Sequence, residues 1–340
     1  MEYRSLGTPE LQVSVIGFGG WPMSGMFYGA TQDKVALSAL RRAIDVGINL
    51  FDTAAGYGVG HSEQLMGEAL KGDRNDVLIV TKGGNIYDPE IKYYARDSRY
   101  ETIVSNCDES LRNLGTDYID LYLIHWPDYL TPIEEPMRAL ETLRAQGKIR
   151  FGGVSNFTTD FLERACAAHP IVADQLGYHM LDRRHAEAII PFCRKHGLGV
   201  MAYGSLAHGL LTGSFTSDTR FDDDDWRVRT EHAFGLPLFS RDHFGKNVAA
   251  VDRLKPIAQR AGVTLPQLAL HWVLQEPAVS TALVGCRSTD EVDAAVAAIA
   301  ADIPDDVVRE ADAITADAYH RMLPEVLPWE EVGPVRRTET

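Results

Sequence analysis

Cysteine is scarce in this sequence, with four residues in a chain of 340. Cys107, Cys166, Cys193 and Cys286 are scattered and form no CxxC pair, which argues against a disulfide framework and against a zinc site. Long apolar runs are also missing, because no stretch approaches the roughly 18 residues of a membrane-spanning helix. The first residues, MEYRSLGTPE, lack the basic and apolar regions of a secretory signal. We therefore expect a protein of the reducing cytoplasm.

Positive charge is in deficit, with 33 Lys and Arg against 48 Asp and Glu and a net charge of −15. Such a surface repels nucleic acid and anionic membranes, so we expect a small molecule as the partner. A few positively charged side chains close together can still bind a phosphate within such an acidic protein. The hydrophobic share of 45% excludes a disordered or fibrous chain. The sequence points to no particular oligomeric state.

Short runs rich in Val, Ile and Leu alternate along the chain with amphipathic stretches of ten or more residues. The runs are apolar rather than alternating, as expected of parallel strands buried on both faces. The eight apolar runs are residues 15–19, 48–53, 77–82, 119–126, 149–155, 172–178, 198–204 and 280–285. The helical stretches between and after them are residues 34–46, 62–71, 99–114, 133–146, 159–169, 184–196, 248–261 and 289–300.

This alternation predicts an α/β fold, a closed (β/α)8 TIM barrel. We expect one domain over residues 1–340, with its core at about 14–300. Residues 3–13 read as a hairpin before the first barrel strand, and residues 265–275 and 305–316 as extra helices. Residues 208–246 read as a long loop after the seventh strand, and residues 317–340 as a tail. The length of 340 residues also fits two domains.

A dinucleotide-binding Rossmann domain is the alternative fold. Gly17-Phe18-Gly19-Gly20 follows an apolar run, and Asp52 ends the next one. However, Pro22 stands at the third glycine position. Asp52 also lies more than thirty residues further on, rather than about twenty. The barrel is therefore the favoured fold.

Polar residues follow three neighbouring strands of the predicted barrel. Asp52, Lys82 and His125 stand at strand ends, and Tyr57 lies in the loop after Asp52. The carboxyl ends of barrel strands meet at one face, where chemistry takes place. A protonated lysine beside Tyr57 predicts a tyrosine pKa lowered from about 10, which would suit general acid–base catalysis. His125 could orient the same substrate oxygen.

In these residues and in the motifs that contain them, the sequence resembles the aldo-keto reductase family. Three motifs carry the resemblance over residues 3 to about 300: GINLFDTA at 47–54 followed by Tyr57, LYLIHWP at 121–127, and GKIR with GVSNF at 147–157. The resemblance implies a catalytic tetrad of Asp52, Tyr57, Lys82 and His125. It also implies that Tyr57 donates the proton in carbonyl reduction, and that a nicotinamide cofactor supplies the hydride.

The resemblance further implies where that cofactor binds. Ser155, Asn156 and Gln175 would hydrogen-bond its carboxamide, and Tyr203 would stack on the nicotinamide ring. The loop YGSLAHGLLTG at 203–213, with Ser205, Leu206, Gly209 and Leu211, resembles the pyrophosphate-binding loop. Residues Gly285, Arg287, Ser288 and Glu291 stand where the family binds the adenosine. Arg287 favours NADP(H), because it could pair with the 2′-phosphate. The acidic Glu291, and Ala295 where an Asn is common, leave NAD(H) open.

The substrate pocket is expected to be apolar. Trp21 and Trp126 should line it beside Tyr57, and such walls suit a bulky carbonyl or the face of a sugar ring. Further wall residues are expected from residues 85–98 and from the tail. These are Tyr87, Tyr93, Tyr94, Met322, Leu323 and Trp329.

The favoured function is an NADP(H)-dependent oxidoreductase that reduces an aldehyde or ketone to an alcohol, or runs the reverse reaction. One alternative is a catalytically weak, NADP(H)-binding redox-sensing subunit with the same fold. Another is a metal-dependent barrel hydrolase or isomerase, which needs several carboxylates or histidines at strand ends. Only Asp52, His125 and Asp174 are available for that, so we expect no metal.

Overall fold

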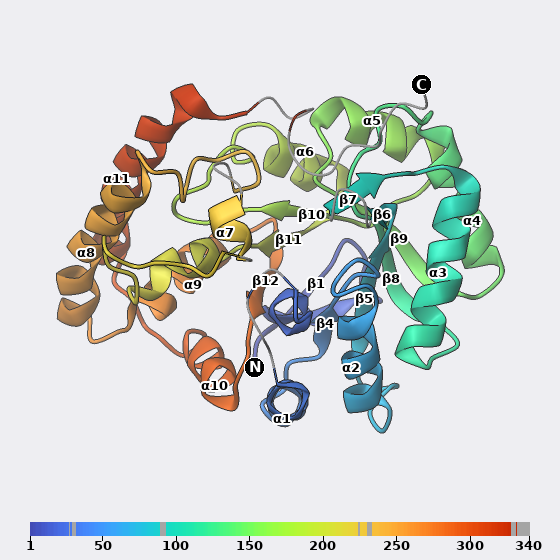
Figure 1. Cartoon of the computed structure of the whole chain (residues 1–340), viewed down its shortest axis with the longest axis horizontal. Helices are drawn as coiled ribbons and strands as arrows, with labels where there is room; N and C mark the ends of the chain where they lie inside the picture. The colour runs from blue at the N-terminus through green and yellow to red at the C-terminus, as the bar shows by residue number, and fades with distance from the viewer. Residues whose placement is uncertain are drawn as a thin grey trace.

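Eight parallel strands form a closed barrel at the centre of the molecule, with helices around it (Figure 1). The computed structural model describes residues 1–26, 28, 32–88, 93–223, 225–229, 233–327 and 331. The barrel strands are β3 (Ile16–Gly19), β4 (Leu50–Asp52), β5 (Leu78–Gly83), β8 (Ile119–Ile124), β9 (Ile149–Ser155), β10 (Ala173–Gly177), β11 (Gly199–Tyr203) and β12 (Val279–Gly285). Each lies within two residues of its predicted range, so the predicted (β/α)8 barrel is confirmed.

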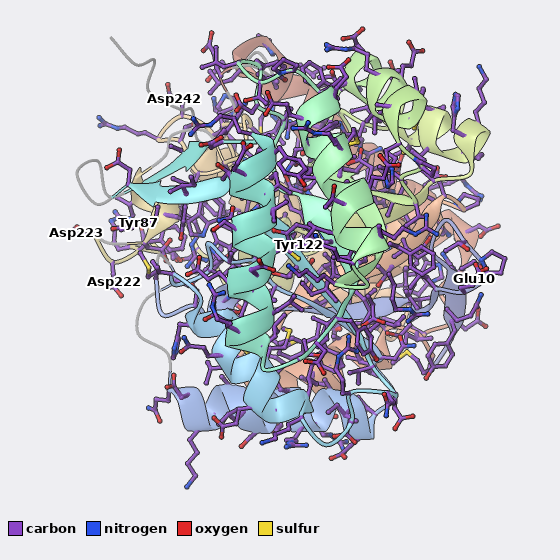
Figure 2. All side chains as sticks on the ribbon, turned by 90° about the vertical axis from the view of Figure 1, so that its right-hand side faces the viewer. Glu10, Tyr87, Tyr122, Asp222, Asp223 and Asp242 are labelled. Carbon is purple, nitrogen blue, oxygen red and sulfur yellow. The ribbon has the colours of Figure 1, made fainter. Side chains whose placement is uncertain are left out.

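The barrel closes where β12 pairs with β3, with Ala282 opposite Ile16 and Gly285 opposite Gly19. The strands are apolar runs because both of their faces are covered. Every residue of β4, β8 and β10 is buried. Among the described residues, Tyr122 of β8 is the largest fully buried side chain, and it lies beneath the helices that follow β5 and β8 (Figure 2).

The helices follow the strands in the order that the alternation predicts. Their bounds are α1 (Asp33–Asp45), α2 (His61–Leu70), α3 (Tyr100–Leu114), α4 (Glu134–Ala145), α5 (Thr159–Ala168), α6 (Ile189–His196), α7 (Trp226–Arg229), α8 (Phe244–Arg260), α9 (Leu265–Leu274), α10 (Thr289–Ala297) and α11 (Asp305–Met322). Helices α3 and α6 end where Gly115 and Gly197 adopt left-handed backbone, with φ of 63° and 70°. Glycine adopts this conformation without a Cβ clash. In the described part of the chain, no helix is long and apolar enough to cross a membrane.

Three helix boundaries differ clearly from the prediction. Helix α6 begins at Ile189 rather than at 184, because Arg184 is held in a turn by its ion pair with Asp182 at 2.7 Å. Helix α8 begins four residues early, at Phe244. Helix α11 continues to Met322, into the expected tail, because Ala318, Tyr319 and Met322 extend its buried stripe. A short 3₁₀ helix, η3 (Leu323–Glu325), follows it.

The predicted N-terminal hairpin is confirmed as β1 (Tyr3–Ser5) and β2 (Gln12–Ser14). Leu6, Leu11 and Val13 of this hairpin pack against apolar side chains inside the barrel. The hairpin therefore closes the end at which the barrel strands begin. Glu10 of its turn lies on the opposite side of the molecule from Asp222, Asp223 and Asp242 (Figure 2).

Several insertions surround the end of the barrel at which the strands finish. The 3₁₀ helix η1 (Trp21–Met23) follows β3, and a second hairpin, β6 (Asn85–Asp88) with β7 (Tyr93–Arg96), follows β5. After β11 come the 3₁₀ helix η2 (Ala207–Thr212) and then α7, within the predicted long loop 208–246. Of these insertions, η1 and the segment after β11 contribute walls to the site described next, whereas the described residues of the β6–β7 hairpin do not line it.

Candidate active site

Asp52, Lys82 and Tyr57 lie in direct contact. Asp52 is the last residue of β4, and Lys82 stands on the neighbouring strand β5. The Lys82 Nζ donates to Asp52 Oδ2 at 2.8 Å and to the Thr53 carbonyl oxygen at 2.8 Å. It also lies 3.4 Å from the Tyr57 hydroxyl. The Lys82 side chain is 0% exposed and that of Asp52 is 5% exposed.

Burial dominates the titration of this group. Desolvation raises the pKa of Asp52 and lowers the pKa of Lys82, while the attraction of the opposite charge opposes both shifts. Burial also raises the pKa of the Tyr57 phenol well above 10, and the Asp52 charge adds to that rise. The sequence-based expectation of a lowered tyrosine pKa is therefore wrong. Asp52 offsets the charge of Lys82, so Tyr57 keeps its proton at neutral pH.

His125 faces Tyr57 from the end of β8. The two ring centroids are 5.8 Å apart and the rings are nearly perpendicular, at 74°. Burial lowers the pKa of His125 well below 6.5, and the Lys82 charge lowers it further. The imidazole is therefore neutral near pH 7. Its buried Nδ1 has no hydrogen-bond partner within the described residues.

Most of the predicted site residues line one cavity of about 570 Å³ at the C-terminal ends of the strands. These residues are Trp21, Asp52, Tyr57, His125, Trp126, Ser155, Asn156, Gln175, Tyr203, Ser205, Leu206, Gly209, Gly285, Arg287 and Glu291. Three predicted residues do not line it. Lys82 is covered by Asp52 and Tyr57, and Leu211 packs in the core at 1% exposed. Ser288 caps α10, where its Oγ accepts a hydrogen bond from the Glu291 N–H at 3.3 Å.

The residues expected to hold a carboxamide form a connected polar network. The Gln175 Nε2 donates to Asp52 Oδ1 at 2.7 Å, and the Ser155 hydroxyl donates to the Gln175 carbonyl oxygen at 2.8 Å. The Asn156 Nδ2 donates to Ser155 Oγ at 2.9 Å, and the Tyr203 hydroxyl donates to Asn156 Oδ1 at 2.8 Å. This network connects Asp52, and through it Lys82, to the hydroxyl of Tyr203.

The other end of the cavity carries charge. Glu291 accepts a hydrogen bond from the Arg287 backbone N–H at 2.7 Å, and its carboxylate lies 3.5 Å from the Arg287 guanidinium. Arg220 and Arg227 also line the cavity. The chain at η2 is left-handed at Ala207 and His208, with φ of 47° and 54°. Polar amides at one end and arginines along the wall fit an extended, phosphate-bearing dinucleotide.

Several cavity residues were missed by the sequence analysis. Tyr28, His208, Arg227 and Phe234 line the cavity. The last three come from residues 208–246, which read as polar because of the acidic run at 222–225. Aromatic residues recur through that same segment, and this recurrence predicts that the segment packs as a wall of the cavity.

Those expected outer wall residues whose side chains the structure describes do not line the cavity. The Tyr94 hydroxyl donates to the Gly56 carbonyl oxygen, and its ring packs against Tyr87. Met322 is fully buried in the core, and Leu323 is exposed. The Tyr93 side chain and Trp329 lie outside the described residues. Asp174 is fully buried and does not line the cavity, so among the described residues it does not join Asp52 and His125 as a cluster of ligands.

Comparison with known proteins adds independent findings. The model of the Aldo/keto reductase family matches residues 15–316. The aldo-keto reductase YhdN of Bacillus subtilis is 36% identical, over 86% of this chain and 87% of that protein. The NADH-specific methylglyoxal reductase of Escherichia coli is 31% identical, over 90% and 95%. The solved structure of the glycerol dehydrogenase AKR11B4 from Gluconobacter oxydans superposes with a TM-score of 0.83, at 33% identity over 96% and 97%.

Proposed function

Because this chain belongs to the aldo/keto reductase family and is an aldo-keto reductase enzyme, we propose that it reduces an aldehyde or ketone to an alcohol, or runs the reverse reaction, with NADP(H). One observation carries the proposal. A tyrosine that stays protonated at neutral pH lines a cavity between a neutral histidine and a buried Asp–Lys pair. When bound, a nicotinamide supplies the hydride that the carbonyl carbon accepts.

In the reductive direction the side chains handle the carbonyl oxygen. The neutral imidazole of His125 donates a hydrogen bond to that oxygen and orients the carbonyl. Tyr57 transfers its phenolic proton to the oxygen as negative charge develops there. The Lys82 ammonium, 3.4 Å from the Tyr57 hydroxyl, then stabilises the phenolate left behind. In the reverse direction the phenolate accepts the alcohol proton.

The residues that would hold the cofactor fall into groups, each suited to a different part of the cofactor. Ser155, Asn156 and Gln175 offer donors and acceptors for a carboxamide, and Tyr203 offers an aromatic face. Ser205, Leu206, Gly209 and Leu211 belong to the loop proposed for the pyrophosphate, and Gly285, Arg287, Ser288 and Glu291 to the adenosine end. Trp21 and Trp126 would form the walls of the substrate pocket.

The direct test is a panel of aldehydes and ketones assayed with NADPH and with NADH. Carbonyl-dependent oxidation of the cofactor supports the proposed function. Tight cofactor binding with negligible turnover on every carbonyl would contradict it and favour a redox-sensing subunit.

The four cysteines are free thiols, which supports a location in the reducing cytoplasm.

We expect the two reaction directions to depend differently on pH. The raised pKa of Tyr57 keeps the phenol protonated, and the lowered pKa of His125 keeps the imidazole neutral, through the neutral range. The rate of reduction should therefore be flat there and fall only at alkaline pH. The rate of alcohol oxidation should rise with pH, because it needs the phenolate. Measuring kcat in both directions from about pH 5 to pH 10 checks this. A reduction rate that falls between about pH 6 and 8 would instead indicate control by a histidine.

We expect Glu291→Gln to shift cofactor preference toward NADPH. The Glu291 carboxylate pairs with Arg287 and would repel a 2′-phosphate bound there. Both side chains are largely exposed, so the ratio of kcat/KM for NADPH to that for NADH should rise only about threefold to fivefold. Glu276→Gln, which breaks the ion pair with Arg194 away from the cavity, is the matched control. An unchanged or lower ratio in Glu291→Gln would remove Glu291 from the cofactor site.

A further inference from the structure

Glu63 is a buried acidic residue that the proposed reaction does not use. It stands in the first turn of α2 and is 0% exposed, although glutamate is seldom fully buried unless it is paired. It does not line the cavity. Burial raises the pKa of its carboxyl, and hydrogen bonds from Thr81 and Asn113 oppose that rise. Burying a carboxylate is costly unless its oxygens are hydrogen-bonded, so the contacts of Glu63 indicate its role.

The two carboxylate oxygens of Glu63 join α2 to two other elements. Oε1 accepts a hydrogen bond from the Thr81 hydroxyl at 2.6 Å, and Oε2 accepts one from Asn113 Nδ2 at 2.9 Å. Thr81 stands on β5 directly before Lys82, and Asn113 stands near the end of α3. The carboxylate therefore fixes the first turn of α2 against the strand that carries Lys82.

The same turn of α2 also holds the backbone of Tyr57. The N–H of Ser62, the residue before Glu63, donates to the Tyr57 carbonyl oxygen at 3.2 Å. The Ser62 hydroxyl donates to the Gly20 carbonyl oxygen at 3.0 Å and accepts a hydrogen bond from the Thr53 hydroxyl at 3.0 Å. Tyr57 is thus tied to the residue next to the buried carboxylate.

The loop between Tyr57 and α2 is strained. Its residues Gly58, Val59 and Gly60 are all left-handed, with φ of 65°, 54° and 88°. Glycine adopts this conformation freely, but a β-branched valine rarely does. The Val59 side chain is 56% exposed, so its own packing does not hold it there. Such strain persists only where the surrounding structure fixes the ends of the loop, and the anchored first turn of α2 is one of those ends.

We propose that Glu63 is a positioning residue, which holds the Tyr57 hydroxyl within reach of the Lys82 ammonium by joining the turn after Tyr57 to the strand that carries Lys82. The hydroxyl oxygen lies 3.4 Å from Lys82 Nζ, at the long end of the hydrogen-bond range. A small shift of either residue would break this contact. The inference rests on the proposed function and deepens it, because the contact stabilises the phenolate formed in reduction.

Glu63→Gln tests the positioning. The glutamine keeps the shape and can still accept from Thr81, but its amide nitrogen then faces the amide nitrogen of Asn113, donor against donor. We expect kcat for carbonyl reduction to fall about threefold to tenfold, and KM to stay within about twofold. The phenolate of Tyr57 would also be less stable. The pH midpoint of alcohol oxidation should therefore rise by about half a unit to one unit.

A double variant should rescue the loss. Combining Glu63→Gln with Asn113→Asp exchanges donor and acceptor, so that the new amide donates to the new carboxylate. Both kcat and the pH midpoint should return to within about twofold, or about a quarter of a unit, of the wild-type values. Thr81→Val removes the hydroxyl that Glu63 binds and should change both quantities in the same direction as Glu63→Gln. It also decides the proposal if Glu63→Gln does not fold.

Asp120→Asn is the matched control. Asp120 is also buried, near the start of β8, and accepts a hydrogen bond from the Ile79 N–H of β5 at 3.0 Å. It pairs with Arg74 and Arg150 at the end of the barrel away from the cavity. Its replacement should lower the free energy of unfolding but leave kcat and the pH midpoint unchanged. If Asp120→Asn moves the pH midpoint as far as Glu63→Gln does, the effect is a general loosening of the barrel and the positioning role is wrong.

The NMR signal of the Tyr57 phenol carbon, assigned by its absence in Tyr57→Phe, gives a readout that needs no turnover. It should move in Glu63→Gln and return in the double variant, because it reports the contact with Lys82. A folded Glu63→Gln in which neither this signal nor the pH midpoint moves, whatever its kcat, would overturn the positioning role and leave the proposed function standing. Absence of turnover on every carbonyl would overturn the proposed function, and the NMR signal would still decide the positioning role.

Discussion

Replacing Tyr57 with phenylalanine should lower kcat for carbonyl reduction by about 10²- to 10⁴-fold, the size of a general-acid contribution. The phenylalanine ring keeps the shape of the cavity wall but has no proton to give to the carbonyl oxygen. In the described part of the chain, Tyr57 is the tyrosine whose hydroxyl lies within hydrogen-bond distance of the Lys82 ammonium, at 3.4 Å. The rate of NADPH consumption with a good aldehyde measures the effect.

Two controls separate this effect from a loss of structure. Cofactor affinity, measured by fluorescence titration, should stay within about threefold, because the lost hydroxyl serves the substrate. Tyr178→Phe should keep full activity, since Tyr178 is buried against Trp272 and does not line the cavity. Full turnover in Tyr57→Phe would show that another group donates the proton.

Replacing Lys82 with methionine should lower the free energy of unfolding by about 3–5 kcal/mol, as expected when one partner of a buried ion pair is removed. The buried Asp52 carboxylate would then lack the Lys82 ammonium as its counter-charge. The Thr53 carbonyl oxygen would lose the hydrogen bond that it accepts from the same ammonium. Urea unfolding at neutral pH measures the loss. Activity should fall as well, because the phenolate form of Tyr57 would lose its stabilising charge.

The pH dependence of that loss is distinctive. Without Lys82, the folded-state pKa of Asp52 rises further above its unfolded value, so the destabilisation is fully present above the folded pKa. It should shrink as the pH falls through that pKa, because protonation removes the unpaired charge. The double variant Asp52→Asn with Lys82→Met carries no buried charge at these positions and should regain much of the lost stability. If the double variant is as unstable as Lys82→Met, the loss in the free energy of unfolding comes from altered packing and not from an unpaired buried charge.

The barrel was predictable from local patterns because each strand is buried on both faces. Burial on both faces favours a mostly apolar run, so residues 119–124 stand out in the sequence alone, even with Asp120 among them. The grouping of Asp52, Lys82 and His125 followed from the same argument, since neighbouring strands end at one face. The start of α6 was not predictable, because it depends on the buried pairing of Asp182 with Arg184.

The titration of Tyr57 also needed the tertiary structure. The sequence indicates a lysine near the tyrosine, but the sign of the pKa shift depends on how far the phenol is desolvated and on what offsets the lysine charge. In the structure Asp52 neutralises Lys82 and burial prevails, so the pKa rises. Distance and desolvation set such shifts, and neither can be read from residue types.

The sequence by itself determined the class of fold and the family, and it predicted the four residues that we propose for the acid–base group, because these follow from periodicity and from motifs on consecutive strands. The tertiary structure alone decided what surrounds that group. Trp126, His208 and Phe234 meet around one cavity although the longest of their separations exceeds a hundred residues. Ring stacking requires a defined distance and angle, and only the folding of the long segment after β11 over the barrel sets them.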